Sequence, residues 1–233
     1  MKKITQTGFI LGMIFLTANS FGQATDSVSN KVANKRTVQP TYLDLVLNVI
    51  STNLNYGDAN SSLADYKKST LGGQVGVSFN AGITRNFSLV PELYLMMKGG
   101  SLQANNPLTI NKTTLRFYTV ELPVLARFHL GKVHMNAGPT IAYNVYGTRQ
   151  MEGATKSLSF NHSMDGFKRW EAGVQVGAGY TFQTKRRRVA LDIRYNYGLT
   201  NIARSGEMYN RSLILAMHFS KPWKTSPLAR NKN

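Results

Sequence analysis

Eight segments of the chain alternate apolar and polar residues with a period of two, and this pattern constrains the fold more than any other feature. Successive side chains of a β-strand point to opposite faces, so each segment predicts a strand with one apolar and one polar face. Each runs about ten residues, near the ~9–11 that a tilted strand needs to cross a bilayer. The segments lie at residues 43–50, 71–81, 87–97, 118–128, 133–145, 169–182, 189–197 and 209–219.

The connections between these segments alternate between short and long. Short turns are predicted at residues 84–86, 130–132 and 183–186, and long loops rich in Gly, Asn, Ser and Asp at 55–70, 99–113, 147–167 and 200–207. Antiparallel strands joined by short turns at one end and long loops at the other are typical of an up-and-down barrel. The predicted fold is therefore all-β, an eight-stranded antiparallel up-and-down transmembrane β-barrel.

The polar faces carry charges of both signs, although the chain has only 11 Asp and Glu against 28 Lys and Arg. An eight-stranded barrel has a narrow interior that side chains fill, and charges enclosed there must pair or stay hydrated. A soluble, lipocalin-like barrel would instead have an apolar interior that binds a hydrophobic ligand. We favour the polar interior and predict a luminal charge network with a structural role. Its predicted members are Asp44, Glu92, Glu121, Arg127, Arg169, Glu171, Asp192 and Arg194.

Aromatic residues gather at both ends of the apolar faces. Two aromatic girdles around an aliphatic band are typical of a barrel that crosses a bilayer. The girdle near the short turns is predicted to contain Phe79, Phe87, Phe128, Tyr180, Phe182 and Phe219. The girdle near the long loops is predicted to contain Tyr118, Tyr143, Trp170, Tyr195, Tyr197 and Tyr209.

The N-terminal residues 1–24 have the order of a secretory signal peptide: Lys2 and Lys3, a short apolar run, and small residues that place cleavage after Gly22 or Ala24. Residues 25–40 are polar and without periodicity, and we interpret them as a periplasmic linker. The barrel is predicted to occupy residues 41–220, followed by a basic tail at 221–233. Both termini are then expected in the periplasm.

Composition narrows the function classes. The chain has no cysteine, which excludes disulfides, iron–sulfur clusters and cysteine nucleophiles, and export makes a nucleic-acid partner unexpected despite the formal charge of +17. The excess cations are expected to form a rim that meets lipid head groups or docks an acidic periplasmic partner. They are Lys31, Lys35, Arg36, Arg85, Lys132, Lys185, Arg186, Arg187, Arg188, Lys221, Lys224, Arg230 and Lys232.

Four segments, in this order, resemble the PorT-like outer-membrane β-barrel family of Bacteroidetes: residues 91–99 (PELYLMMKG), 118–128 (YTVELPVLARF), 136–139 (NAGP) and 191–202 (LDIRYNYGLTNI). The resemblance extends over roughly residues 42 to 220 and implies a small barrel of the OmpA/OmpX type, without implying one activity. Such barrels commonly end at a terminal aromatic residue, whereas here Phe219 is followed by the basic tail.

Candidate chemistry is sparse. His162, Ser163 and Asp165 supply the residue types of a catalytic triad, but neighbours in one loop seldom reach triad geometry. His129, His134 and His218 are predicted to face inward near the short turns, where they line the lumen rather than hold a metal. We therefore predict no catalytic, cofactor or metal site.

The proline positions bear on strand register. Pro91, Pro123 and Pro139 fall inside predicted strands, where proline removes a ladder donor, and we interpret them as bulges.

The predicted function is that of a monomeric outer-membrane barrel with a structural or interaction role, a filled lumen and external binding loops. The alternatives are an outer-membrane lipid-modifying enzyme and a secreted soluble barrel that carries a hydrophobic ligand.

Overall fold

The structure, a computed structural model, describes residues 38–58, 60–163, 166–183 and 187–220. The predicted signal peptide, nearly all of the predicted linker and the basic tail lie outside the described residues. The eight predicted strands are confirmed. They are β1 (Tyr42–Asn55), β3 (Thr70–Gly82), β4 (Phe87–Leu102), β5 (Thr113–Leu130), β6 (Val133–Met151), β8 (Trp170–Gln183), β9 (Arg188–Gly198) and β10 (Tyr209–Ser220).

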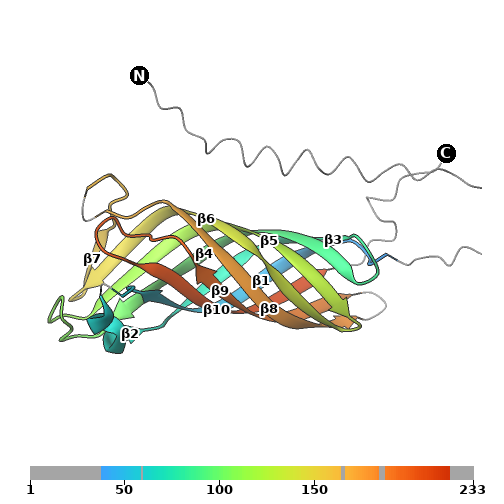
Figure 1. The fold of residues 1–233 in the computed structure, drawn as a ribbon, viewed down its shortest axis with the longest axis horizontal. Helices are drawn as coiled ribbons and strands as arrows, with labels where there is room; N and C mark the ends of the chain where they lie inside the picture. The colour runs from blue at the N-terminus through green and yellow to red at the C-terminus, as the bar shows by residue number, and fades with distance from the viewer. Residues whose placement is uncertain (1–37, 59, 164–165, 184–186, 221–233) are drawn as a thin grey trace, which may run out of the picture. The chain divides into compact units, whose positions relative to one another are not determined.

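The strands form one closed antiparallel barrel. Each long strand pairs with the next along the chain, and β1 pairs with β10 to close the sheet. Closure gives each of the eight long strands a partner on both sides, which a sheet surrounded by hydrocarbon requires. Figure 1 shows the strands running obliquely around the barrel. No helix in the described part of the chain has the length and apolar character needed to cross a membrane.

Short elements occur in two of the long connections. The 3-10 helix η3 (Ser61–Tyr66) and the strand β2 (Lys67–Lys68) lie between β1 and β3, and β7 (Ala154–Ser157) pairs with the end of β6. β2 and β7 lie at the same end of the barrel (Figure 1). At the other end, β5 and β6 are joined by two residues, of which Gly131 has φ +68°, a left-handed conformation that favours glycine.

Alternation places apolar side chains outside and polar side chains inside. In β1, for example, Leu45 is 67% exposed whereas Val46 is fully buried, and the inward Asp44 is fully buried too. The apolar residues of the barrel exterior are therefore largely accessible, as in a membrane barrel, and the polar interior excludes the lipocalin-like alternative.

The predicted bulges at Pro91, Pro123 and Pro139 are wrong. The ladders keep the same register on both sides of each proline. The register of β5 against β6 shifts instead between Tyr118 and Thr119, where Val145 lies opposite no residue of β5 and both Val145 and Tyr146 are exposed. Proline removes one hydrogen bond without adding a residue, so it does not by itself create a register shift.

Candidate functional site

The lumen is the candidate site because the buried charged side chains of the barrel converge there. Arg194 on β9 lies at its centre and is 1% exposed. Its Nη1 donates to Glu92 Oε2 at 2.6 Å, its Nη2 donates to Glu92 Oε1 at 3.2 Å, and its Nε donates to Asp192 Oδ2 at 3.0 Å. Two parallel bonds to one carboxylate fix the guanidinium in a single orientation.

Asp192 is the second centre of this network. Its Oδ2 accepts bonds from Arg127 Nη2 at 3.2 Å and from Asn136 Nδ2 at 3.0 Å, while its Oδ1 lies 2.7 Å from His134 Nε2. Both carboxylate oxygens are therefore occupied, by side chains that reach across the lumen from β5 and β6 and by Arg194 of β9 itself. A buried carboxylate with this many partners offsets much of the cost of its desolvation.

Toward the short turns, Asp44 extends the same network. Arg188 Nη1 lies 2.9 Å from Asp44 Oδ2, and the Arg188 guanidinium stacks 4.5 Å from the centre of the Tyr42 ring. His218 connects this pair to the centre, because its Nδ1 lies 3.5 Å from Asp44 Oδ2 and its Nε2 lies 2.9 Å from Arg194 Nη2. We call this set the turn-side charge network. Its members are Asp44, Glu92, Arg127, His134, Arg188, Asp192, Arg194 and His218.

A second, smaller group lies closer to the long loops. Lys98 Nζ is 2.7 Å from Glu171 Oε2 and 3.9 Å from Glu121 Oε2. Asparagine amides supply further donors: Asn144 Nδ2 donates to Glu171 Oε1 at 2.6 Å, and Asn210 Nδ2 donates to Glu171 Oε2 at 2.8 Å. We call Lys98, Glu121 and Glu171 the loop-side charge cluster. One ammonium group faces two carboxylates there, and the asparagine amides donate further hydrogen bonds to the Glu171 carboxylate.

Of the eight residues predicted to form a luminal network, the structure places seven inside the barrel. Asp44, Glu92, Arg127, Asp192 and Arg194 lie in the turn-side charge network, and Glu121 and Glu171 lie in the loop-side charge cluster.

Arg169 is the exception. It precedes β8, and its Nη1 donates to the backbone carbonyls of Asn144 and Val145, at 3.0 Å each, where β6 bulges. Its guanidinium also stacks 4.6 Å from the centre of the Phe160 ring.

The predicted luminal network did not include two luminal cations, Arg188 and Lys98. Arg188 was predicted at an exposed rim, but it begins β9 and points inward, with 2% exposure. Lys98 lies on the inward face of β4, in step with Glu92, Tyr94 and Met96. The alternation of β4 continues one residue past the predicted end of that strand at residue 97, so the sequence pattern could have identified Lys98.

Beyond the loop-side charge cluster, at the end of the barrel that carries the long loops, the barrel interior becomes apolar. Phe117 from β5 and Phe167 from the β7–β8 connection meet edge to face, with ring centres 5.3 Å apart. We call the buried residues here the loop-end apolar cluster: Leu54, Tyr56, Leu63, Leu102, Leu115, Phe117, Phe167 and Ile202. Burial in this cluster raises the pKa of Tyr56 to about 12, against a weaker opposing effect of Arg149.

The predicted aromatic residues stand on the outer surface at the two ends of the apolar band. Phe128 and Phe182 are exposed near the short turns, and Trp170 and Tyr197 are exposed near the long loops. Neighbouring rings touch in both groups: the ring centres of Tyr180 and Phe182 are 4.7 Å apart, and those of Tyr143 and Trp170 are 5.0 Å apart.

The residues considered for chemistry are spread over different environments. His162 and Ser163 are exposed, Ser163 Oγ bonds Asn161 Oδ1, and Asp165 lies outside the described residues. His129 and His134 are buried with ring centres 6.1 Å apart, but His129 contacts Ser88 Oγ at 2.9 Å while His134 and His218 contact carboxylates. The described part of the chain has no group of three or more His, Asp or Glu side chains placed to hold a metal.

The chain is similar to known proteins at two levels, a sequence family and a set of solved structures. No curated protein sequence matches the chain. Solved structures with a similar fold include Neisserial surface protein A (12% identity, 80% of this chain and 99% of that chain, TM-score 0.44) and Ail, the attachment invasion locus protein of Yersinia pestis (7% identity, 79% and 100%, TM-score 0.40). Another is OprG from Pseudomonas aeruginosa (9% identity, 79% and 94%, TM-score 0.36). Residues 24–204 match the outer membrane protein beta-barrel domain family, and the chain therefore belongs to that family of outer-membrane barrels.

Proposed function

We propose that this outer-membrane barrel acts as a structural or interaction protein through its long loops, and that it is neither an open channel nor an enzyme. The observation that carries the proposal is the filling of the lumen. The turn-side charge network occupies one section, the loop-side charge cluster the next, and the loop-end apolar cluster the last. A barrel of eight strands has no room for a water-filled path beside these side chains.

The long loops support an interaction role because they are built on a packed base. Leu63 of η3, Phe167 and Ile202 come from three different connections and are all buried in the loop-end apolar cluster. Loop tips above this base stay accessible: Leu108 is 66% exposed and Ile110 is 78% exposed in the β4–β5 connection. Rigidly held loops on a stable scaffold are a common arrangement for binding surfaces.

The finer identity is also part of the proposal. The sequence resemblance supports membership of the PorT-like group of Bacteroidetes barrels, with residues 1–24 removed as a signal peptide. Both ends of the barrel domain lie beside the short turns, since Asp44 pairs with Ser220 and Gln39 N donates to Thr84 O. This arrangement supports periplasmic termini and external long loops, because outer-membrane barrels keep their short turns in the periplasm.

Partners follow from the same orientation. Arg85 and Lys132 are exposed at the short-turn end, where they are available to lipid head groups or to an acidic periplasmic protein. We propose a monomeric barrel without a cofactor or a nucleic-acid partner.

Two measurements on the purified protein in planar bilayers and in phospholipid vesicles test the functional proposal. We expect no steady single-channel conductance, with a known porin reconstituted in parallel as the positive control. We also expect no release of fatty acid from the vesicle phospholipids. A steady, large conductance would refute the closed lumen, and fatty-acid release that depends on the protein would favour the lipid-modifying enzyme.

A further inference from the structure

The outer surface of the barrel is hollowed around Gly73 on β3. In one row of the sheet, Gly73 pairs with Val49 on β1 and Met97 on β4, and Met97 pairs with Tyr118 on β5. A Cβ added at Gly73 would meet only the carbonyl oxygen of Asn48, at 3.8 Å, so the space in front of this position is open. Because this row lacks one side chain, the surface has a groove of ≈ 640 Å³ across these four strands, with Val145 of β6 and Met217 of β10 also lining it.

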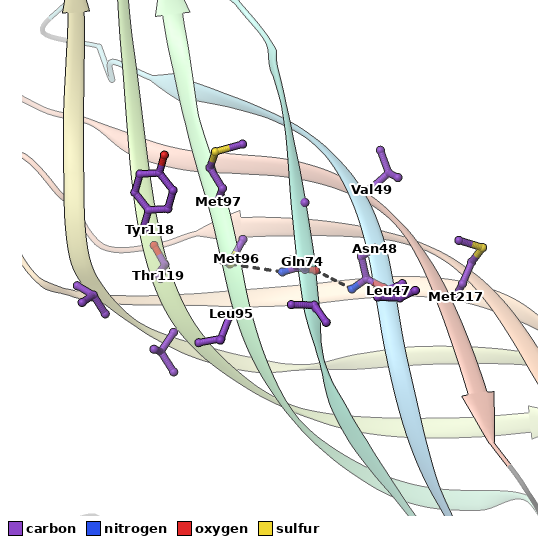
Figure 2. Close-up of a pocket in the computed structure, with 14 residues that line it drawn as sticks. Leu47, Asn48, Val49, Gln74, Leu95, Met96, Met97, Tyr118, Thr119 and Met217 are labelled. Carbon is purple, nitrogen blue, oxygen red and sulfur yellow. Dashed lines mark hydrogen bonds between the residues drawn. The ribbon is translucent and has the colours of Figure 1, made fainter. Parts of the chain in front are cut away.

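The groove is lined by apolar side chains. In the row next to Gly73, Leu47 pairs with Val75 and Val75 pairs with Leu95, and all three line the groove. Figure 2 labels Leu47 and Leu95. Inward-facing polar residues also border it, but their side chains bond to one another: Asn48 Nδ2 donates to Gln74 Oε1 at 2.7 Å, and Gln74 Nε2 contacts Met96 Sδ at 3.4 Å. The groove therefore offers an almost purely apolar surface within the membrane-facing band.

A cation lies at the loop end of this groove. Arg116 is exposed two residues from Tyr118 on the same outward face of β5, and its Nη1 lies 3.5 Å from Sδ of Met97, a residue that lines the groove. Tyr118 belongs to the aromatic residues near the long loops, which is the level at which a bilayer changes from hydrocarbon to head groups. The apolar groove therefore ends beside the Arg116 guanidinium, at the level of the lipid head groups.

We propose that this groove binds one acyl chain of a membrane lipid whose anionic phosphate head group contacts Arg116. Charge complementarity favours a lipid over a second copy of the chain. The outward positions of β1, β3, β4 and β5 contain no Asp or Glu, so the same face of another copy would bring no anion to Arg116. A phosphate supplies that anion, and arginine binds phosphate with paired, directed donors.

Native mass spectrometry of the full-length protein in mild non-ionic detergent, titrated with dipalmitoyl phosphatidylglycerol, tests this inference. Gly73→Phe fills the groove and should weaken binding of the first lipid about fivefold or more, a difference of ~1 kcal/mol. Arg116→Gln should remove the preference for phosphatidylglycerol over phosphatidylcholine with the same chains. Matched controls are Ala137→Phe, at a small exposed outward residue on β6, and Lys156→Gln, at an exposed cation on β7. Both controls should bind the lipid like the unmodified protein.

Gly73→Val serves as a second, smaller substitution if the phenylalanine variant does not fold, with far-ultraviolet circular dichroism as the check of folding. Equal lipid retention by folded Gly73 variants and the unmodified protein would overturn the inference. A dimer that dissociates in these variants would also overturn it, because the groove would then be filled by a second copy.

Discussion

The two ends of the lumen are closed by opposite kinds of chemistry. The turn-side charge network is built by strand residues that bond across the barrel, such as Arg194 with Glu92. The loop-end apolar cluster combines strand residues such as Phe117 with loop residues such as Leu63, and it excludes charge. The first section lies behind an exposed apolar wall, whereas the second lies where the longest strands, β5 and β6, carry polar residues such as Thr114 and Gln150.

This difference follows from the surroundings of each section. A barrel in hydrocarbon places its apolar side chains outward, so its polar residues are left to face one another inside. A section surrounded by water gains most by burying apolar side chains, as a soluble domain does. Along the barrel axis, the molecule therefore changes from a polar interior with an apolar exterior to an apolar interior with a polar exterior. Removing a charged side chain should affect the first section most, and truncating an apolar side chain should affect the second section most.

Arg194→Ala should give the largest effect, because it leaves Glu92 and Asp192 without their shared guanidinium. Removing one partner of an enclosed ion pair costs about 3–5 kcal/mol, less where water enters the lumen. The thermal unfolding midpoint in detergent measures the effect, with Asp58→Ala at an exposed loop position as the control. Equal, small shifts in both variants would show that the Arg194 network contributes little.

Leu63→Ala tests the other section. Leu63 is 1% exposed in the loop-end apolar cluster, and its truncation should cost about 3 kcal/mol through lost burial and the cavity left behind. The connection between β1 and β3 should then become sensitive to protease before the barrel unfolds. Leu108→Ala, at a residue that is 66% exposed, should leave both measurements unchanged. Protease resistance of Leu63→Ala would mean that the loops do not depend on the cluster.

Alkaline pH should destabilise the loop-end section through Tyr56. The pKa of Tyr56 is raised to about 12 in the fold from about 10 when unfolded, so its stabilising contribution is complete below pH 10 and is lost as the pH rises to 12. The two-unit difference corresponds to ~3 kcal/mol. Unfolding midpoints measured between pH 9 and 12 should fall less steeply for Tyr56→Phe than for the unmodified protein. Parallel curves would place the Tyr56 hydroxyl in contact with water.

Arg169→Ala should have the smallest effect of the four, about 1 kcal/mol, because its bonds to two backbone carbonyls are partly accessible to solvent. The sequence reading, which placed Arg169 among the luminal charges, predicts instead a loss comparable to that of Arg194→Ala. Comparing the unfolding midpoints of the two variants decides between the two placements.

Strand periodicity carried most of the prediction, and the failures lie where periodicity ends. The eight strands follow from alternation, and the barrel follows from the alternation of short and long connections. The inward direction of Glu92, Glu121 and Asp192 follows once the two aromatic girdles assign the apolar faces to lipid. Arg169 was misplaced because its position was counted in step with Glu171, although β8 begins only at Trp170.

Other features of the site had no periodic signal. Arg188 stands in a run of basic residues, which suggested a solvated rim, and only the start of β9 turns its side chain inward. The loop-end apolar cluster draws Leu63, Phe167 and Ile202 from non-repeating connections, so their meeting depends on tertiary structure. The register shift between Tyr118 and Thr119 likewise has no proline or glycine at these two positions from which it could have been predicted.

The seam between β1 and β10 has a consequence for how the protein is made. At its turn-side end Asp44 pairs with Ser220, which is 220 − 44 = 176 positions later in the chain. β1 therefore cannot complete its pairing until β10 has been synthesised. Until then each of these strands presents an unpaired edge, and every unsatisfied backbone group costs several kcal/mol in hydrocarbon. A half-built barrel therefore has no stable state in a bilayer. Insertion and closure are expected to be one event, and a chain that stops before Tyr209 should never enter the membrane.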